Sequence, residues 1–143
     1  MLGHTFRFGI NNNSIGATID AGKATIKSRM WKGSNDGTRV NEGSEGSIYS
    51  NDSAIASDAF GPYDTYDNST NEYEGGDFEL SVTFDKGDQP DGVVEVYYQT
   101  ATDGATFDSN NAENNKGRMV CALQMAETTA LTAEKTYVKS FSL

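Results

Sequence analysis

Apolar and polar residues alternate along several short segments of the chain, most regularly in its last third. Residues 78–84 read Phe-Glu-Leu-Ser-Val-Thr-Phe, and further strand-like runs lie at 93–98, 119–125 and 136–143. Alternate side chains of a strand point to opposite faces, so each run predicts a β-strand with one buried face. Asp91-Gly92 and Asp103-Gly104 separate the runs, and Asp-Gly favours hairpin turns because both central residues of such a turn adopt positive φ. This pattern predicts an all-β fold, an antiparallel β-sandwich (jelly-roll-like) with long loops.

The first 22 residues have a weaker pattern. Phe6 and Phe8 alternate with Arg7, and the run Asn11–Ser14 then interrupts the alternation, because asparagine side chains compete for backbone hydrogen bonds and favour turns. We therefore predict an extended N-terminal arm over residues 1–22 and a single β-sandwich domain over residues 23–143. Either the arm is a short strand that ends in a mobile loop, or it reaches onto an adjacent subunit.

Residues 24–32 predict a strand with two different faces. Ile26 and Met30 share one face, whereas Lys27, Arg29 and Trp31 share the other. Tryptophan and arginine are enriched in protein interfaces, which makes Trp31 a candidate anchor for a partner. The alternative is that the aliphatic stems of the two basic residues cover the indole ring.

Residues 57–77 interleave aromatic and acidic residues and contain almost no aliphatic ones. Such a segment cannot form a core element alone, so it predicts a long ordered loop whose rings dock on another surface. For each ring in the chain the alternative is the core of the domain itself. The candidate partner-interface residues are Phe6, Phe8, Trp31, Phe60, Tyr63, Tyr66 and Tyr73.

Composition narrows the possible partners. The chain has 143 residues, enough for one domain, but only 36% of them are hydrophobic. This predicts either a thin core, as in a two-layer sandwich, or a core that a neighbouring subunit completes. The net charge is −10 and the basic residues are scattered, so we expect no nucleic-acid binding. The sequence contains neither a signal peptide nor a run of about 20 apolar residues, so we expect no membrane insertion and synthesis in a cytoplasm.

Few residues could carry chemistry. His4 is the single histidine and Cys121 the single cysteine, so we expect no catalytic triad, no zinc site and no enzyme. Acidic side chains cluster in polar segments, where solvent keeps them ionised. We expect no cofactor, although two segments, Asn35–Gly37 and Asp64–Asn68, carry the oxygen ligands that calcium prefers. Neither segment matches an EF-hand loop.

The block from Phe78 to Leu143 resembles a recurrent type of tailed-bacteriophage virion protein. The matching motifs, in chain order, are Val94-Glu95-Val96-Tyr97, Thr102-Asp103-Gly104-Ala105-Thr106-Phe107 and Lys139-Ser140-Phe141-Ser142-Leu143. The resemblance implies a β-sandwich structural subunit of the virion without catalytic residues. It is either a capsid decoration (cement) protein that bridges subunits of the major capsid protein, or a neck or tail component.

Such a protein is made in the host cytoplasm, becomes part of the virion, and forms homo-oligomers on the particle or contacts other virion subunits. A different class also stays open from the residues themselves. Exposed tyrosines can stack on sugars, so a carbohydrate-binding β-sandwich module, for example on a fibre, is the alternative.

Overall fold

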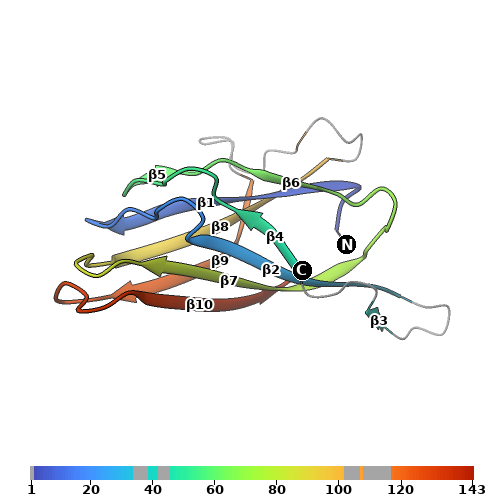
Figure 1. Cartoon of the computed structure of the whole chain (residues 1–143). Helices are drawn as coiled ribbons and strands as arrows, with labels where there is room; N and C mark the ends of the chain where they lie inside the picture. Colours follow the sequence, from blue (N-terminus) through green and yellow to red (C-terminus); the bar gives the residue numbers. More distant parts are fainter. Residues whose placement is uncertain (1, 34–38, 42–45, 102–106, 108–116) are drawn as a thin grey trace.

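The computed structural model describes residues 2–33, 39–41, 46–101, 107 and 117–143. These residues form strands and turns, and the strands build two five-stranded antiparallel sheets that pack face to face (Figure 1). The predicted all-β antiparallel sandwich is therefore confirmed. Within the described ranges, no helix is long and apolar enough to cross a membrane.

The first sheet, called sheet I here, has the strand order β5-β1-β8-β9, and β6 also pairs with β1. Its strands are β1 (Thr5–Ile15), β5 (Ala59–Phe60), β6 (Asp64–Asp67), β8 (Asp91–Ala101) and β9 (Arg118–Ala126). The second sheet, sheet II, has the order β10-β7-β2-β3, and β4 also pairs with β2. Its strands are β2 (Ala24–Gly33), β3 (Arg39–Asn41), β4 (Gly46–Ser50), β7 (Gly75–Phe84) and β10 (Lys135–Ser142).

The core lies between the two sheets and is rich in aromatic rings. The ring of Phe8 is central, because its centroid lies 5.2 Å from that of Phe78 and 5.7 Å from that of Tyr98. Rings this close, tilted or edge-to-face, contribute attraction beyond their buried area. Both ends of the described chain are tied to the start of β7, since Leu2 N–H donates to Glu74 O and Leu143 N–H donates to Gly76 O.

The interpretation of residues 1–22 as an arm is wrong for most of that segment. β1 pairs with β8 along all of its residues and also contacts β5 and β6, so it is an interior strand of sheet I. Phe6 is 0% exposed and Phe8 is 1% exposed, so both belong to the core. The asparagines do not end the strand, because Asn12 continues the inward-facing row and its side chain is fully bonded.

Three asparagines hold the connecting segments, and all three are buried: Asn12, Asn51 and Asn68. Asn51 illustrates the arrangement. Its Oδ1 accepts a hydrogen bond from Ala24 N (2.9 Å), and its Nδ2 donates to Asp20 O (2.8 Å) and Ser53 O (3.1 Å). One side chain thereby bonds to backbone groups of separate segments, and it supplies the acceptor for the N–H of the buried Ala24.

Two further predictions about connections need correction. Asp91-Gly92 is not a hairpin turn, because residues 85–90 cross from β7 in sheet II to β8 in sheet I and Asp91 already belongs to β8. Gly92 has φ +150°, and a Cβ there would lie 2.3 Å from Asn13 O, so glycine is needed for close approach to β1. Asp103-Gly104 lies outside the described residues.

The segment 57–77 is not one long loop, since it contributes β5, β6 and the first residues of β7. β5 and β6, with two and four residues, are too short to show an alternating pattern. Residues 127–134 form an irregular connection between β9 and β10.

Candidate functional site

The outer face of sheet I carries a group of side chains that we call the aromatic cluster: Arg7, Phe60, Tyr63, Tyr97 and Phe107. Arg7 and Tyr97 come from the paired strands β1 and β8, Phe60 ends β5, and Tyr63 precedes β6. All five side chains are partly exposed. In β1 the even-numbered residues face the core. Arg7 therefore points to the opposite, outer face of the sheet, where the rings of Tyr63 and Phe107 contact it.

A glycine makes room for this cluster. Gly9 lies opposite Tyr97 in the register of β1 and β8. A Cβ at Gly9 would lie 2.6 Å from Cζ of Phe60 and 2.7 Å from Cε1 of Tyr63, which is closer than real contacts allow. The rings therefore rest directly on the backbone of β1. Their centroids are 5.1 Å apart between Phe60 and Tyr63 and 5.9 Å apart between Phe60 and Tyr97.

The guanidinium of Arg7 lies between two rings. Its Cζ is 4.0 Å from the ring centroid of Tyr63 and 4.0 Å from that of Phe107, which is a cation–π geometry on both sides. Arg7 Nε also donates to Gln99 Oε1 over 2.8 Å. Partial burial lowers the pKa of Arg7 from its ordinary value, and the same cause raises the pKa of Tyr63. Arginine titrates so far above neutrality that the group stays charged.

Polar partners fix the other side of the cluster. Glu95 accepts one hydrogen bond from Asn11 Nδ2 (2.9 Å) and another from the Tyr97 hydroxyl (3.1 Å). Burial and the bond to Glu95 raise the pKa of Tyr97. The cluster thus combines the partly buried guanidinium of Arg7 with aromatic rings and, beside them, the carboxylate of Glu95. This composition suits recognition by contact, since tyrosine, phenylalanine and arginine are the residues enriched at protein interfaces.

The structure brings together only part of the predicted interface. Phe60 and Tyr63 lie in the aromatic cluster, and their role at an interface stays a prediction. Phe6, Phe8 and Tyr73 belong to the hydrophobic core. Tyr66 is partly buried and packs on the core, with its ring centroid 5.1 Å from that of Phe6.

Trp31 occupies the predicted face of β2 but offers little surface. It shares the outer face of sheet II with Lys27 and Arg29, yet it is only 8% exposed. A Cβ on Gly75, its partner on β7, would lie 2.9 Å from Cζ2 of the indole. The ring therefore lies across a glycine, and this contact accounts for part of its burial.

Sequence reasoning missed three members of the cluster: Arg7, Tyr97 and Phe107. The alternating pattern indicates only that Arg7 is a polar residue between two phenylalanines and that Tyr97 belongs to a strand. A usable signal was present in the glycine of the run Phe8-Gly9-Ile10, since a glycine within a strand marks a close approach by another group.

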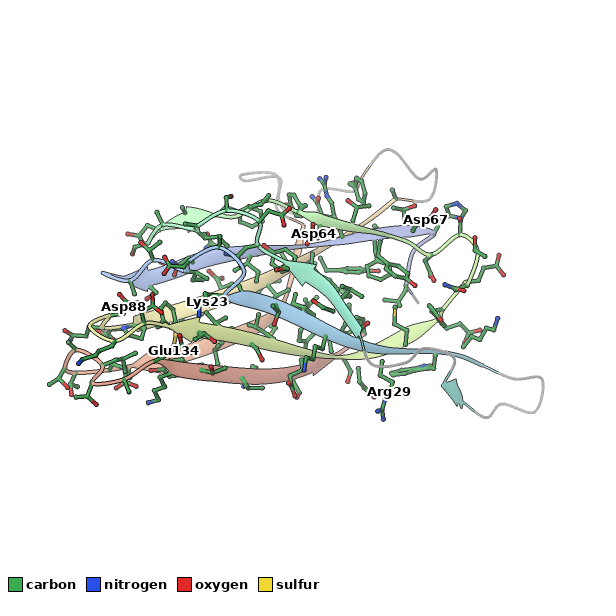
Figure 2. The ribbon with its side chains drawn as sticks, in the orientation of Figure 1. Lys23, Arg29, Asp64, Asp67, Asp88 and Glu134 are labelled. Atoms are coloured by element: carbon green, nitrogen blue, oxygen red, sulfur yellow. The ribbon has the colours of Figure 1, made fainter. Side chains whose placement is uncertain are left out.

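The carboxylates that the structure describes do not gather into a metal site. Within the described ranges, no group of three or more His, Cys, Asp or Glu side chains is arranged to hold a metal ion. Asp64 accepts a hydrogen bond from Ser50 N, and Asp67 accepts one from Ser69 N. The Asn68 side chain donates to Gly3 O and Tyr73 O and accepts from Tyr73 N. Figure 2 shows Asp64 and Asp67 apart along β6. The other candidate segment, Asn35–Gly37, lies outside the described residues.

Comparison with family models, with curated proteins and with solved structures finds no match for this chain. The inference of function therefore rests on the residues and on the fold.

Proposed function

We propose that the protein is a non-enzymatic structural subunit that binds a neighbouring protein subunit through the aromatic cluster on sheet I. The observation that carries the proposal is the arrangement of that cluster on the outer face of a sheet: a charged guanidinium lies between the rings of Tyr63 and Phe107, and the rings of Phe60 and Tyr63 rest on Gly9. Arginine and aromatic residues placed on a rigid element are the usual anchors of protein interfaces.

The setting that we propose is the particle of a tailed bacteriophage, with the protein decorating the capsid and bridging subunits of the major capsid protein. The resemblance of residues 78–143 to virion proteins supports this setting. A two-layer sandwich with broad faces also suits a subunit that lies on a shell and adds buried interface. Specific interfaces of this kind bury about 1,200–2,000 Å² in total.

A carbohydrate-binding module is the second candidate, and exposed tyrosine rings beside amide groups favour it. The geometry of the cluster argues for a protein partner instead. One face of Tyr63 and one face of Phe107 are covered by Arg7, and the rings of Phe60 and Tyr63 are tilted by 54° to each other, so they do not form a flat stacking platform. The amides of Asn11 and Gln99 already take part in hydrogen bonds within the cluster.

The first test is whether the protein is part of the particle. Virions are purified from the phage that encodes the chain, and the copy number of the protein is measured by quantitative mass spectrometry. We expect a fixed stoichiometry relative to the major capsid protein. Absence from purified virions would refute the setting, and labelling of the protein on the tail rather than on the head would favour the neck or tail alternative.

The second test addresses the surface. Particles that lack the protein are incubated with purified wild-type protein, with Arg7→Ala, or with Tyr63→Ala. Truncation of an interface anchor costs about 2 kcal/mol or more, so binding should weaken roughly 30-fold. The matched control is Lys86→Ala, an exposed residue in the connection between β7 and β8, which should bind like the wild type. Unchanged binding of both cluster variants, with wild-type melting curves, would exclude this surface.

A glycan array completes the comparison. Specific binding of a sugar that is lost in Tyr63→Ala would favour the carbohydrate-binding alternative over the structural one.

A further inference from the structure

The outer face of sheet II carries basic and acidic side chains that lie side by side without forming ion pairs with each other among the described residues. Lys27 and Arg29 lie on β2, and their direct partners across the β2–β7 register are Glu79 and Asp77. Lys27, Arg29 and Asp77 are exposed and Glu79 is partly exposed. Figure 2 shows Arg29 pointing away from the sandwich. A basic row and an acidic row therefore run side by side along two neighbouring central strands.

These opposite charges do not neutralise each other within the chain. Among the described residues, neither Lys27 nor Arg29 has an ion pair within 4.0 Å, although Lys23 and Lys135 each form one. Asp77 Oδ1 accepts a hydrogen bond from the hydroxyl of Ser142 over 2.7 Å. An open hollow of about 350 Å³ lies over this region, lined by the four charged residues and by Ser28, Phe78, Ser140 and Phe141. The surface is thus charged in rows and recessed.

The rows become complementary when the same face of a second copy is placed over them. Because Lys27 is level with Glu79 and Arg29 is level with Asp77, a two-fold axis parallel to the strands and midway between β2 and β7 maps each residue onto its opposite charge. Lys27 of one copy then faces Glu79 of the other, and Arg29 faces Asp77. A two-fold interface uses the same patch on both subunits, and this patch is self-complementary.

We propose that two copies of the chain associate through the outer faces of sheet II about this axis. The charge pattern selects the axis, because an axis perpendicular to the strands would place β2 on β2 and bring like charges together. The same charge pattern argues against a nucleic acid as the partner, because the acidic row on β7 lies beside the basic row on β2 and repels phosphate groups. Val138 on β10, which is 50% exposed, adds apolar surface at the margin of the same face.

The size of the face predicts the strength of the contact. Four strands spaced about 4.8 Å apart and about eight residues long cover roughly 500 Å² on each copy. The pair then buries about 1,000 Å², the lower limit for a specific interface. The dimer should therefore depend on concentration and weaken as salt screens the exposed charges. This proposal is independent of the proposed function, which uses the opposite face of the sandwich.

Charge reversal tests the proposal. The variant Lys27→Glu/Arg29→Glu carries four acidic residues on the face, and the variant Asp77→Lys/Glu79→Lys carries four basic ones. Each protein is studied alone and in an equimolar mixture by sedimentation equilibrium, from micromolar to millimolar concentration at low salt. We expect the wild type to dimerise, each variant alone to self-associate roughly 100-fold more weakly, and the mixture to form a heterodimer.

The control and the second measurement separate association from folding. Lys86→Glu reverses one exposed charge away from the face and should dimerise like the wild type, whereas the single change Arg29→Glu should not. If a double variant fails to fold, the salt dependence of the wild-type dimer still decides, because a contact made by these charges must weaken as salt is raised. A wild type that is monomeric throughout, a dimer that is indifferent to salt, or folded variants that do not combine would overturn the proposal.

Discussion

Replacement of Phe8 by alanine tests whether β1 is part of the core, which is the point on which the fold departs most from the sequence-based expectation. Phe8 is 1% exposed, and its ring centroid lies within 5.8 Å of those of four other rings: Phe6, Phe78, Tyr98 and Phe141. Removal of a buried phenylalanine side chain costs about 3–5 kcal/mol. We expect the upper half of that range, because the neighbouring rings are rigid and fill the vacated space poorly.

A loss of about 4 kcal/mol is a large fraction of the roughly 5–15 kcal/mol that stabilises a domain. Urea unfolding followed by circular dichroism measures it. With a slope of about 2 kcal/mol per molar, the midpoint should fall by about 2 M. The matched control is Asn13→Ala, an exposed position on the same strand, which should change the free energy of unfolding by about 0.5 kcal/mol or less. A Phe8→Ala protein within about 1 kcal/mol of the wild type would show that β1 is not an integral strand and would restore the arm.

Three further predictions follow from buried or bonded groups. Asn51→Ala should lower the free energy of unfolding by about 2–4 kcal/mol, because it leaves the buried Ala24 N–H without its acceptor and removes the donor to Asp20 O and Ser53 O; a loss no larger than that of the exposed Asn13→Ala control would contradict this role. Lys135 and the Tyr137 hydroxyl donate hydrogen bonds to the Glu127 carboxylate and lower its pKa in the folded protein. The ionised carboxylate therefore stabilises the fold at pH values above the pKa of Glu127 in the unfolded chain, and this stabilisation is lost as the pH falls through the lower pKa of the folded protein. Glu127→Gln should therefore reduce the acid sensitivity of unfolding, and an unchanged pH profile would refute the assignment. Cys121 is 6% exposed and burial raises the pKa of its thiol, so Ellman's reagent should label it only after unfolding; rapid labelling of the native protein would show that the side of the sandwich is open.

The strands that the sequence predicted are those with long alternating patterns. β7, β8 and β9 each contain a run of apolar residues at every second position, and the burial of their side chains follows that period. β2 keeps the same period with Ser28 in its inner row, whereas Lys139 interrupts the inner row of β10. β1 has the same period, but its inner row passes from Ile10 to Asn12 and Ser14, and polar residues in the core depend on partners far away in the chain. Local reasoning could not know that Ile55 O would accept a bond from Asn12.

The aromatic cluster was half predictable for a related reason. The density of rings and carboxylates in residues 57–77 pointed to Phe60 and Tyr63 as surface residues. Arg7 and Tyr97 come from β1 and β8, and only the sheet order places them under those rings. Which strands are neighbours is a property of the whole fold, so the composite site could not be assembled from segments.

The edges of both sheets explain why association should use faces rather than strand pairing. An unpaired edge strand is a template for aggregation unless it is short, bulged or charged. β3 and β5 have three and two residues, and β9 carries an irregularity in its pairing where Val96 and Tyr97 face it. On β10, Lys139 pairs with Leu80 and so points to the core side of the sandwich, where its charge acts on the Cys121 thiol. A second strand added beside β10 would have to bury that charge, which is costly without a partner. With the edges protected in these ways, the broad outer surfaces remain for binding, one with rings around a cation and the other with matched rows of charge.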